Sequence, residues 1–202
     1  MTLSHQSLFL MNYLAHIFLS RNIPKIQIGN FIADFVKGNK ISIYPLLVQD
    51  GIRLHRKIDT YTDNHLVVLD TKKRLYPVFG RYSGIVLDVY FDHFLAINFK
   101  KFAPSQNLIC FSLSFYATLI FNYYLLPDKV KSFVWHFILT NRLVTYSKID
   151  GIEKSFAIMQ QFKTPAISSH DARKFLESHY DYLNSQFQLF FTDLIEYLHS
   201  EI

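Results

Sequence analysis

The sequence predicts an all-α fold on three observations. Apolar residues recur at steps of three and four along most of the chain, and convincing alternation with a period of two, the mark of strands, is hard to find. Half of the 202 residues are hydrophobic and only 18% are charged, which excludes a disordered chain and supplies one sizeable core. No linker, low-complexity tract or internal repeat divides the chain, so we expect a single helical domain over residues 1–202.

The final helix has the clearest pattern. From Leu176 to Leu198 apolar residues keep helical spacing, and Ser168, Ser169 and Asp171 supply capping residues upstream, so a helix of about 30 residues is predicted. Breaks are expected at Pro24, Gly38, Gly80 and Pro127, and the many Phe and Tyr residues are expected to fill the core. The other predicted helices are Tyr13–Ser20, Gly29–Lys37, Tyr44–Tyr61, Asn64–Val78, Tyr82–Phe99, Ser105–Leu125, Asp128–Thr145 and Gly151–Phe162.

One uncharged stretch, residues 102–127, is long enough to span a bilayer. Polar Ser114, Thr118 and Asn122 recur in it every four residues, and the polar residues 104–107 shorten its apolar part. We therefore predict a buried core helix and no membrane span. The N-terminus has neither a basic region nor a small-residue cleavage site, so no signal peptide is expected.

Cys110 is the single cysteine, so the chain can form no intramolecular disulfide and no cysteine-rich zinc site. This fits a reducing compartment, and we expect a cytoplasmic protein with Cys110 as an inert core residue.

The charge is unevenly distributed. Residues 1–103 carry 13 basic and 7 acidic side chains, a net charge of +6, whereas the rest of the chain carries −1. A basic front half indicates an anionic partner: nucleic acid, a phosphorylated metabolite, a membrane surface or an acidic protein. The chain lacks a glycine-rich phosphate loop, a nucleophile elbow and a zinc-protease motif, which disfavours kinase and dehydrogenase chemistry.

The segment GIRLHRKIDTYTD, residues 51–63, places His55, Asp59 and Asp63 on one stripe of a helix, each one turn apart. Such a stripe can form the edge of a metal site, and the cations Arg53, Arg56 and Lys57 beside it suit a phosphate ester. The alternative is an exposed face with Arg56–Asp59 and His55–Asp59 pairs.

Acidic residues also interrupt two apolar segments. Asp88, Asp92 and His93 lie in GIVLDVYFDHFLA, residues 84–96, where buried carboxylates are costly unless a cation or hydrogen-bond donors hold them. A metal is favoured there over a structural salt bridge to Arg56 or Arg81. Asp34 and His16 interrupt apolar segments in the same way, although a lone buried His is more often a core residue than a ligand. Together these side chains could converge on Mn²⁺, Mg²⁺ or Fe²⁺.

Four blocks in order resemble the bacterial acyl carrier protein phosphodiesterases, also called acyl carrier protein hydrolases. They are MNYLAH (11–16), GNFIADFVKGN (29–39), GIRLHRKIDTYTD (51–63) and LDVYFDHFLA (87–96). The resemblance covers residues 11–99, with a weaker match at 179–191. Residues 1–10 precede the usual start of that family: either Met11 is the true initiator, or these ten residues are a local, disordered extension.

The resemblance implies an all-α, distorted HD-like helical bundle, distantly related to the HD-type metal-dependent phosphohydrolases. It implies hydrolysis of the phosphodiester between 4'-phosphopantetheine and a serine of holo-acyl carrier protein, with Mn²⁺ as the favoured ion and Mg²⁺ or Fe²⁺ as alternatives. Its acidic carrier protein would dock on the basic front half, through residues such as Lys25, Lys37, Lys40, Lys72, Lys73 and Arg74. No nucleic-acid partner is expected, and no particular oligomeric state is predicted.

Site residues are carried over in the same way. The expected catalytic residues are Asp34, His55, Arg56 and Asp59, and the substrate-binding ones Arg53, Lys57 and Lys37. The expected metal ligands are Asp34, His55, Asp59, Asp92 and His93, with His16, Asp63 and Asp88 in reserve. The sequence departs from the HD pattern at this point: that pattern has His before Asp, whereas here Asp92 precedes His93. Two alternatives stay open: an HD-like phosphohydrolase of a nucleotide or other small phosphate ester, and a non-enzymatic helical binding protein.

Overall fold

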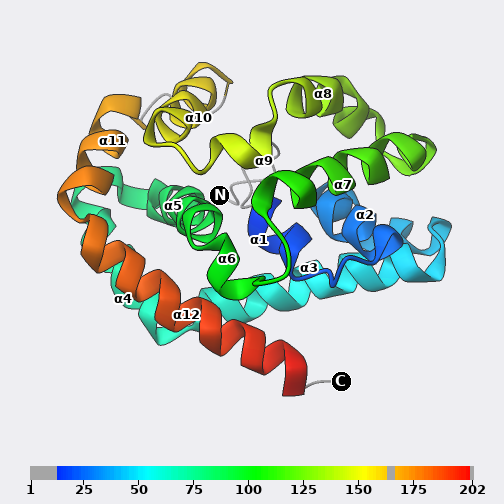
Figure 1. Ribbon diagram of the computed structural model, residues 1–202, viewed down its shortest axis with the longest axis horizontal. Helices are drawn as coiled ribbons and strands as arrows, with labels where there is room; N and C mark the ends of the chain where they lie inside the picture. The colour runs from blue at the N-terminus through cyan, green and yellow to red at the C-terminus, as the bar shows by residue number, and fades with distance from the viewer. Residues whose placement is uncertain (1–12, 163–166, 201–202) are drawn as a thin grey trace. The chain divides into compact units, whose positions relative to one another are not determined.

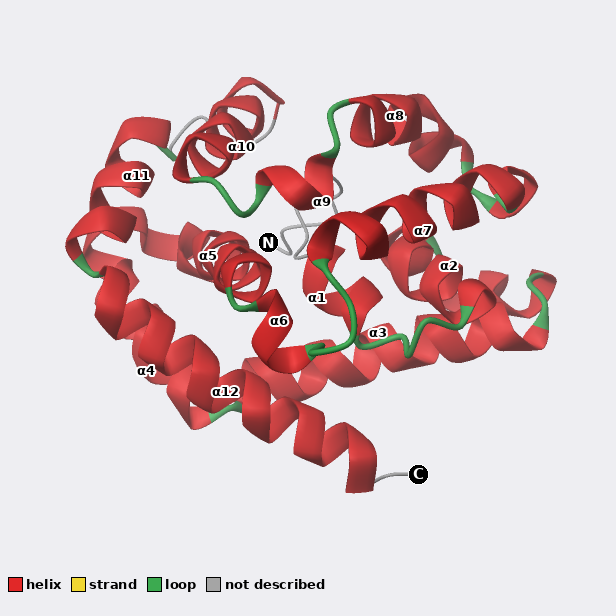
Figure 2. Ribbon diagram, in the orientation of Figure 1, coloured by secondary structure: helices red, strands yellow, loops and turns green. Residues whose placement is uncertain are grey.

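The computed structural model describes residues 13–162 and 167–200, and every regular element in them is a helix (Figure 2). The all-α prediction is confirmed. The expected extension at residues 1–10 lies outside the described residues. The chain divides into two compact units, a first unit of Tyr13–Thr62 and Leu95–Thr145, and a second unit that holds Asp63–Phe94 and residues 146–200. Two helices run from one unit into the other, and the assignment of the whole chain to one domain stays a prediction.

In the first unit, α2 lies against both α1 and α7 (Figure 1). Phe31 of α2 is fully buried, and its ring meets Tyr13, Phe115 and Phe137 at centroid distances of 5.0, 5.3 and 5.4 Å. These aromatic contacts fix α1 and α2 against the later helices. The helices are α1 (Tyr13–Phe18), α2 (Pro24–Ile32), most of α3 (Leu46–Asn64), the end of α5 (Ser83–Ile97), α6 (Phe99–Phe102), α7 (Leu108–Phe121), α8 (Asp128–Leu139) and α9 (Arg142–Thr145), with 3-10 turns at Ala33–Phe35, Gly38–Ile43 and Tyr123–Leu125.

Two glycines let α2 and α3 touch backbone to backbone. A Cβ on Gly29 would overlap the carbonyl oxygen of Val48, and one on Gly51 would overlap the carbonyl oxygen of Ile26. Only glycine permits so close an approach of two helices. The contact brings the residue after Gly29 against the face of α3 that carries His55, one turn beyond Gly51.

In the second unit, α12 packs along α4, and α10 packs against α11. The Phe91 ring of α5 lies 5.3 Å from Phe190 and 5.5 Å from Phe187 of α12, so aromatic side chains fill this core as predicted. The helices are α4 (Leu66–Phe79), the greater part of α5, α10 (Ile149–Phe162), α11 (Ser169–Ser178) and α12 (Tyr180–Ser200), with a 3-10 turn at Gly80–Tyr82.

Several predicted helix bounds were wrong. Pro24 begins α2 instead of breaking the chain, because proline suits the first turn of a helix, and the predicted 29–37 helix already ends at Ile32. The predicted 128–145 helix is interrupted at Asn141, whose φ is +47°. The predicted final helix of about 30 residues is two helices, which are separated where His179 leaves helical geometry with φ −122° and ψ 21°. The Nδ1 atom of His179 lies 3.0 Å from the Phe175 carbonyl oxygen at the end of the first helix.

The uncharged stretch forms α7, which is shorter than expected and only half buried. Phe111, Phe115 and Leu119 face the core, whereas Leu113 and Phe121 are exposed. Cys110 is exposed as well, so its prediction as a core residue was wrong. None of the helices in residues 13–162 and 167–200 is both long and apolar enough to cross a membrane.

Candidate metal centre

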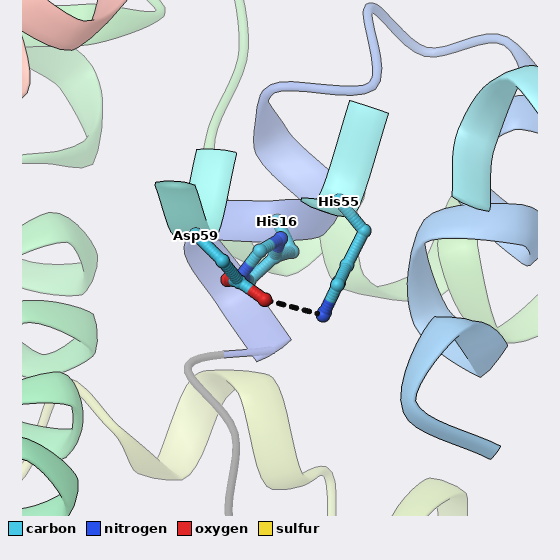
Figure 3. A group of neighbouring side chains, drawn as sticks. All are labelled: His16, His55 and Asp59. Carbon is cyan, nitrogen blue, oxygen red and sulfur yellow. Dashed lines mark ion pairs between the residues drawn. The ribbon is translucent and has the colours of Figure 1, made fainter. Parts of the chain in front are cut away.

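Two imidazoles and a carboxylate meet in the first unit (Figure 3). His16 lies on α1, and His55 and Asp59 lie one turn apart on α3; one ligand atom of each falls within 4.8 Å of the others. Among the described residues, this is the one group of His, Cys, Asp or Glu side chains so arranged. His16, a reserve candidate in the sequence, thus joins two of the leading ones.

The ring nitrogens face the carboxylates. Nε2 of His16 is 3.3 Å from one Asp59 oxygen, and Nε2 of His55 is 3.1 Å from the other. Asp34, in the 3-10 turn after α2, places an oxygen 3.5 Å from the same His55 nitrogen. The imidazoles are buried, with 2% of each side chain exposed, whereas Asp59 is 48% and Asp34 38% exposed. The carboxylates therefore form the side of the cluster that is open to solvent.

Sequence reasoning missed Asn30, which is fully buried in the last turn of α2. Its Oδ1 lies 2.8 Å from Nδ1 of His16 and 3.0 Å from Nδ1 of His55. Its Nδ2 donates to the His16 carbonyl oxygen at 2.8 Å and to Ser20 Oγ at 3.0 Å. A buried amide inside an apolar helix needs such partners, and that cost was the signal in the sequence that could have marked it.

The two imidazoles are also stacked, with ring centroids 4.1 Å apart. Burial and the neighbouring His55 lower the pKa of His16. Burial also opposes a charge on His55, but the neighbouring carboxylates of Asp34 and Asp59 outweigh it and raise the pKa of His55 to about 9. Burial likewise disfavours a charged Asp59, but the facing rings of His16 and His55 hold the pKa of that carboxyl well below its usual range. Without a metal, therefore, His55 carries an additional proton at neutral pH and faces the charged carboxylate of Asp59.

The donor set fits a divalent metal ion. Imidazole nitrogen and carboxylate oxygen are the ligands that such ions take in sites without thiolates, and each imidazole here has its far nitrogen held by a hydrogen-bond partner, as ligand histidines usually have. The half-exposed carboxylates keep the cluster open to solvent, which a catalytic metal site needs and a closed structural site does not.

Three of the predicted cations lie on α3, and Lys37 lies in the stretch before it. Arg56 is exposed, and its guanidinium donates to the Val36 carbonyl oxygen at 3.2 Å, close in sequence to Asp34. Arg53 donates to Asp50 at 2.8 Å and to Gln49 at 3.0 Å. Lys57 is half-buried on α3, and Lys37 is exposed directly after Val36.

The remaining predicted ligands belong to the second unit. Asp92 and His93 of α5 are buried, Asp88 is half-buried, and Asp63 is exposed and pairs with Lys72 at 2.8 Å. Both ring nitrogens of His93 have partners: Nδ1 lies 2.8 Å from the Tyr146 carbonyl oxygen and Nε2 lies 3.0 Å from the Tyr180 hydroxyl. A metal on His93 would have to displace the tyrosine.

The comparison with protein families decides the relationship. The family model described as acyl carrier protein phosphodiesterase matches residues 11–194, nearly the whole chain. The chain belongs to the acyl carrier protein phosphodiesterase family. This is a family of enzymes, and the match extends well beyond residues 11–99, where the sequence blocks carried the resemblance.

Individual relatives agree. A protein of Enterobacter sp. (strain 638) named acyl carrier protein phosphodiesterase is 34% identical over 184 residues, which is 90% of this chain and 94% of the relative. A protein of the same name from Klebsiella pneumoniae (strain 342) is 32% identical over 92% of this chain and 96% of the relative. Another of that name, from Photorhabdus laumondii, is 30% identical over 92% of this chain and 94% of the relative. No solved structure matches the chain significantly, and the distant HD-like relationship stays a prediction.

Proposed function

We propose that this protein is a metal-dependent phosphodiester hydrolase that removes 4'-phosphopantetheine from the serine of holo-acyl carrier protein, giving the apo-protein. One observation carries the proposal: in a member of the acyl carrier protein phosphodiesterase family, the Nε2 atoms of two buried imidazoles converge on a half-exposed carboxylate. This arrangement can hold a cation where substrate and solvent can reach it.

His16, His55 and Asp59 would hold the metal, with Asp34 beside them. Mixed imidazole and carboxylate ligands suit Mn²⁺, our first choice, as well as Mg²⁺ and Fe²⁺. A divalent ion bound there supplies a Lewis acid for the phosphoryl oxygens and lowers the pKa of a coordinated water. Asp92 and His93 are left out of the proposed ligand set, because His93 already has a partner on each ring nitrogen.

The protein's own groups supply the proton transfer. Asp34 stands at the open side of the cluster, and its carboxylate is the proposed acceptor of a proton from the attacking water. The new bond joins the water oxygen to phosphorus, and the bond from phosphorus to the serine oxygen breaks. That oxygen takes up a proton from solvent, and Asp34 returns the proton it accepted to solvent. The products are a serine hydroxyl and 4'-phosphopantetheine.

Arg56 is the proposed phosphate-binding residue. A guanidinium has five N–H donors, and the bond to the Val36 carbonyl oxygen orients the group while leaving others for a phosphate oxygen. Lys37, which follows Val36, and Lys57, which follows Arg56 on α3, add further positive charge. Arg53 contributes less, because Asp50 and Gln49 already engage it.

The proposal is tested by incubating the protein with holo-acyl carrier protein and Mn²⁺ and following the intact mass of the carrier protein. We expect the loss of one phosphopantetheine, abolished by chelator and by Asp34→Ala or His55→Ala. Cleavage of small phosphate esters together with an unchanged carrier protein would select the small-ester hydrolase. Absence of bound metal, with normal stability in His55→Ala, would select the binding protein instead.

A further inference from the structure

Asn30 lies behind both histidines of the cluster, on the side away from Asp59. Its amide orientation is fixed because the His16 carbonyl oxygen can only accept a hydrogen bond, so the NH₂ group must point to it. Ser20 reinforces this arrangement, since its hydroxyl donates to the same carbonyl oxygen at 2.9 Å and accepts from Asn30. The amide oxygen therefore has to face the two imidazoles.

An oxygen in that position determines where the ring protons lie. It can only accept, so Nδ1 of His16 and Nδ1 of His55 must both carry hydrogen. In the neutral rings the lone pairs then belong to the Nε2 atoms, which are the nitrogens that face Asp59.

A different tautomer would be expected without Asn30. A neutral imidazole beside a carboxylate gains a charge-assisted hydrogen bond by placing its proton on Nε2, toward Asp59. That arrangement would satisfy the carboxylate internally and remove the lone pairs that a metal needs.

We propose that Asn30 is a positioning residue that keeps a proton on Nδ1 of His16 and on Nδ1 of His55, so that a metal finds a lone pair on Nε2 of the neutral His16 and needs to displace only the Nε2 proton of His55. The inference deepens the proposed function and rests on it for the role of the metal, but the tautomer itself is a property of the metal-free protein. Asn30 touches neither substrate nor metal; it acts through the two imidazoles.

The experiment records ¹⁵N spectra of the histidine side chains in the metal-free protein and measures Mn²⁺ affinity by calorimetry. Asn30→Leu has nearly the same volume and removes the acceptor; we expect the neutral His16 ring to shift to the Nε2–H tautomer and Mn²⁺ to bind about 10- to 100-fold more weakly. Asn30→Asp keeps an acceptor toward the rings and is expected to retain the Nδ1–H signature.

Ser20→Ala is the matched control, because it removes two hydrogen bonds of the same buried network without touching the imidazole rings, and the bond from Asn30 to the His16 carbonyl oxygen still orients the amide. It should keep both the tautomer and the affinity of the wild type. The inference is overturned if folded Asn30→Leu keeps the Nδ1–H tautomer, or if Ser20→Ala loses Mn²⁺ affinity as strongly. Should Asn30→Leu not fold, an Nε2–H tautomer in Asn30→Asp or in the wild type would overturn it.

A wild type that shows the Nδ1–H tautomer but binds no Mn²⁺ would reject the metal in the proposed function and leave the tautomer control by Asn30 intact. The two failures are therefore distinguishable.

Discussion

At the scale of single residues, the cluster works because its two histidines differ. Burial and its neighbour keep His16 neutral, whereas Asp34 and Asp59 hold a proton on His55 to about pH 9. A metal can bind Nε2 of His55 only after that proton has left. The metal and the proton therefore compete for one nitrogen.

This competition gives a pH dependence to metal binding. Below about pH 9 the apparent affinity for Mn²⁺ should rise about tenfold for each pH unit, and binding at pH 7.5 should release about one proton. Calorimetry in two buffers with different ionisation enthalpies counts the released protons. Binding without proton release would contradict the proposed role of His55.

The metal-free protein should show the opposite trend in stability. The pKa of His55 is raised by folding, so its contribution is fully present below pH 6.5 and is lost as the pH rises through about 9. We expect the melting temperature of chelator-treated protein to fall over that window and the fall to be smaller in His55→Gln. Equal slopes in the two proteins would show that His55 is not the group responsible.

At the scale of helices, the site depends on how closely α2 and α3 approach. Gly29 precedes Asn30, and Gly51 stands one turn before His55, so the backbone contact between the helices sets the distance from the amide to the imidazole. Neither glycine takes part in chemistry, yet both determine where the chemical groups lie.

Gly29→Ala should therefore damage both stability and metal binding. The new methyl group would overlap the Val48 carbonyl oxygen, which we expect to cost about 1–3 kcal/mol of unfolding free energy and to lower Mn²⁺ affinity. Denaturant unfolding and calorimetry measure the two effects.

Gly84→Ala is the matched control, because a Cβ there meets only the flexible side chain of Lys72, at 3.5 Å. Replacing a helical glycine by alanine at such a position should be neutral or stabilising by up to about 1 kcal/mol. A Gly29→Ala protein as stable as the Gly84→Ala protein would refute the close-packing argument.

The helices themselves could largely be predicted from the sequence, because the apolar period of an amphipathic helix is a local property. The buried, apolar α5, predicted over 82–99 and found at Ser83–Ile97, and α4, predicted over 64–78 and found at Leu66–Phe79, are examples. The break at His179 could not be predicted, because it depends on a side chain turning back to cap the preceding helix. The exposed apolar face of α7 depends on tertiary packing, which periodicity alone does not reveal.

At the scale of the whole molecule, the basic front half of the sequence fits an acidic protein substrate. Lys37 and Lys40 are exposed close in sequence to Asp34, in the stretch that leads into α3. If an acidic carrier protein docks there, long-range attraction should raise the rate of encounter and weaken with added salt.

Reversing both charges, Lys37→Glu with Lys40→Glu, should lower kcat/KM for holo-acyl carrier protein about tenfold at low ionic strength and much less at high salt. The control pair, Lys154→Glu with Lys174→Glu, changes net charge equally at exposed positions of the second unit. Steady-state kinetics across a salt series make the comparison, and equal losses in both pairs would reject docking at Lys37 and Lys40.

The composition of the site could be predicted only in part. His55, Asp59 and Asp34 stand out in the sequence as polar residues at helical spacing or within apolar segments, and the structure brings them together with His16. Asn30 carries no charge and does not stand at a telling spacing. Its role could not be predicted, because it depends on contacts with His16 and His55, which are 14 and 25 residues away in sequence. The pattern around Asp92 and His93 indicated a metal site equally well. A sequence does not show, however, that both ring nitrogens of His93 already have hydrogen-bond partners, a backbone carbonyl and a tyrosine hydroxyl.

The proposed metal site at His16, His55 and Asp59 is tested most directly by anomalous diffraction from crystals of the protein grown with Mn²⁺. We expect one strong anomalous peak per chain, within coordination distance of Nε2 of His16, Nε2 of His55 and an oxygen of Asp59. A peak at Asp92 and His93 with none at His16 and His55, or no peak at a saturating concentration of Mn²⁺, would contradict it.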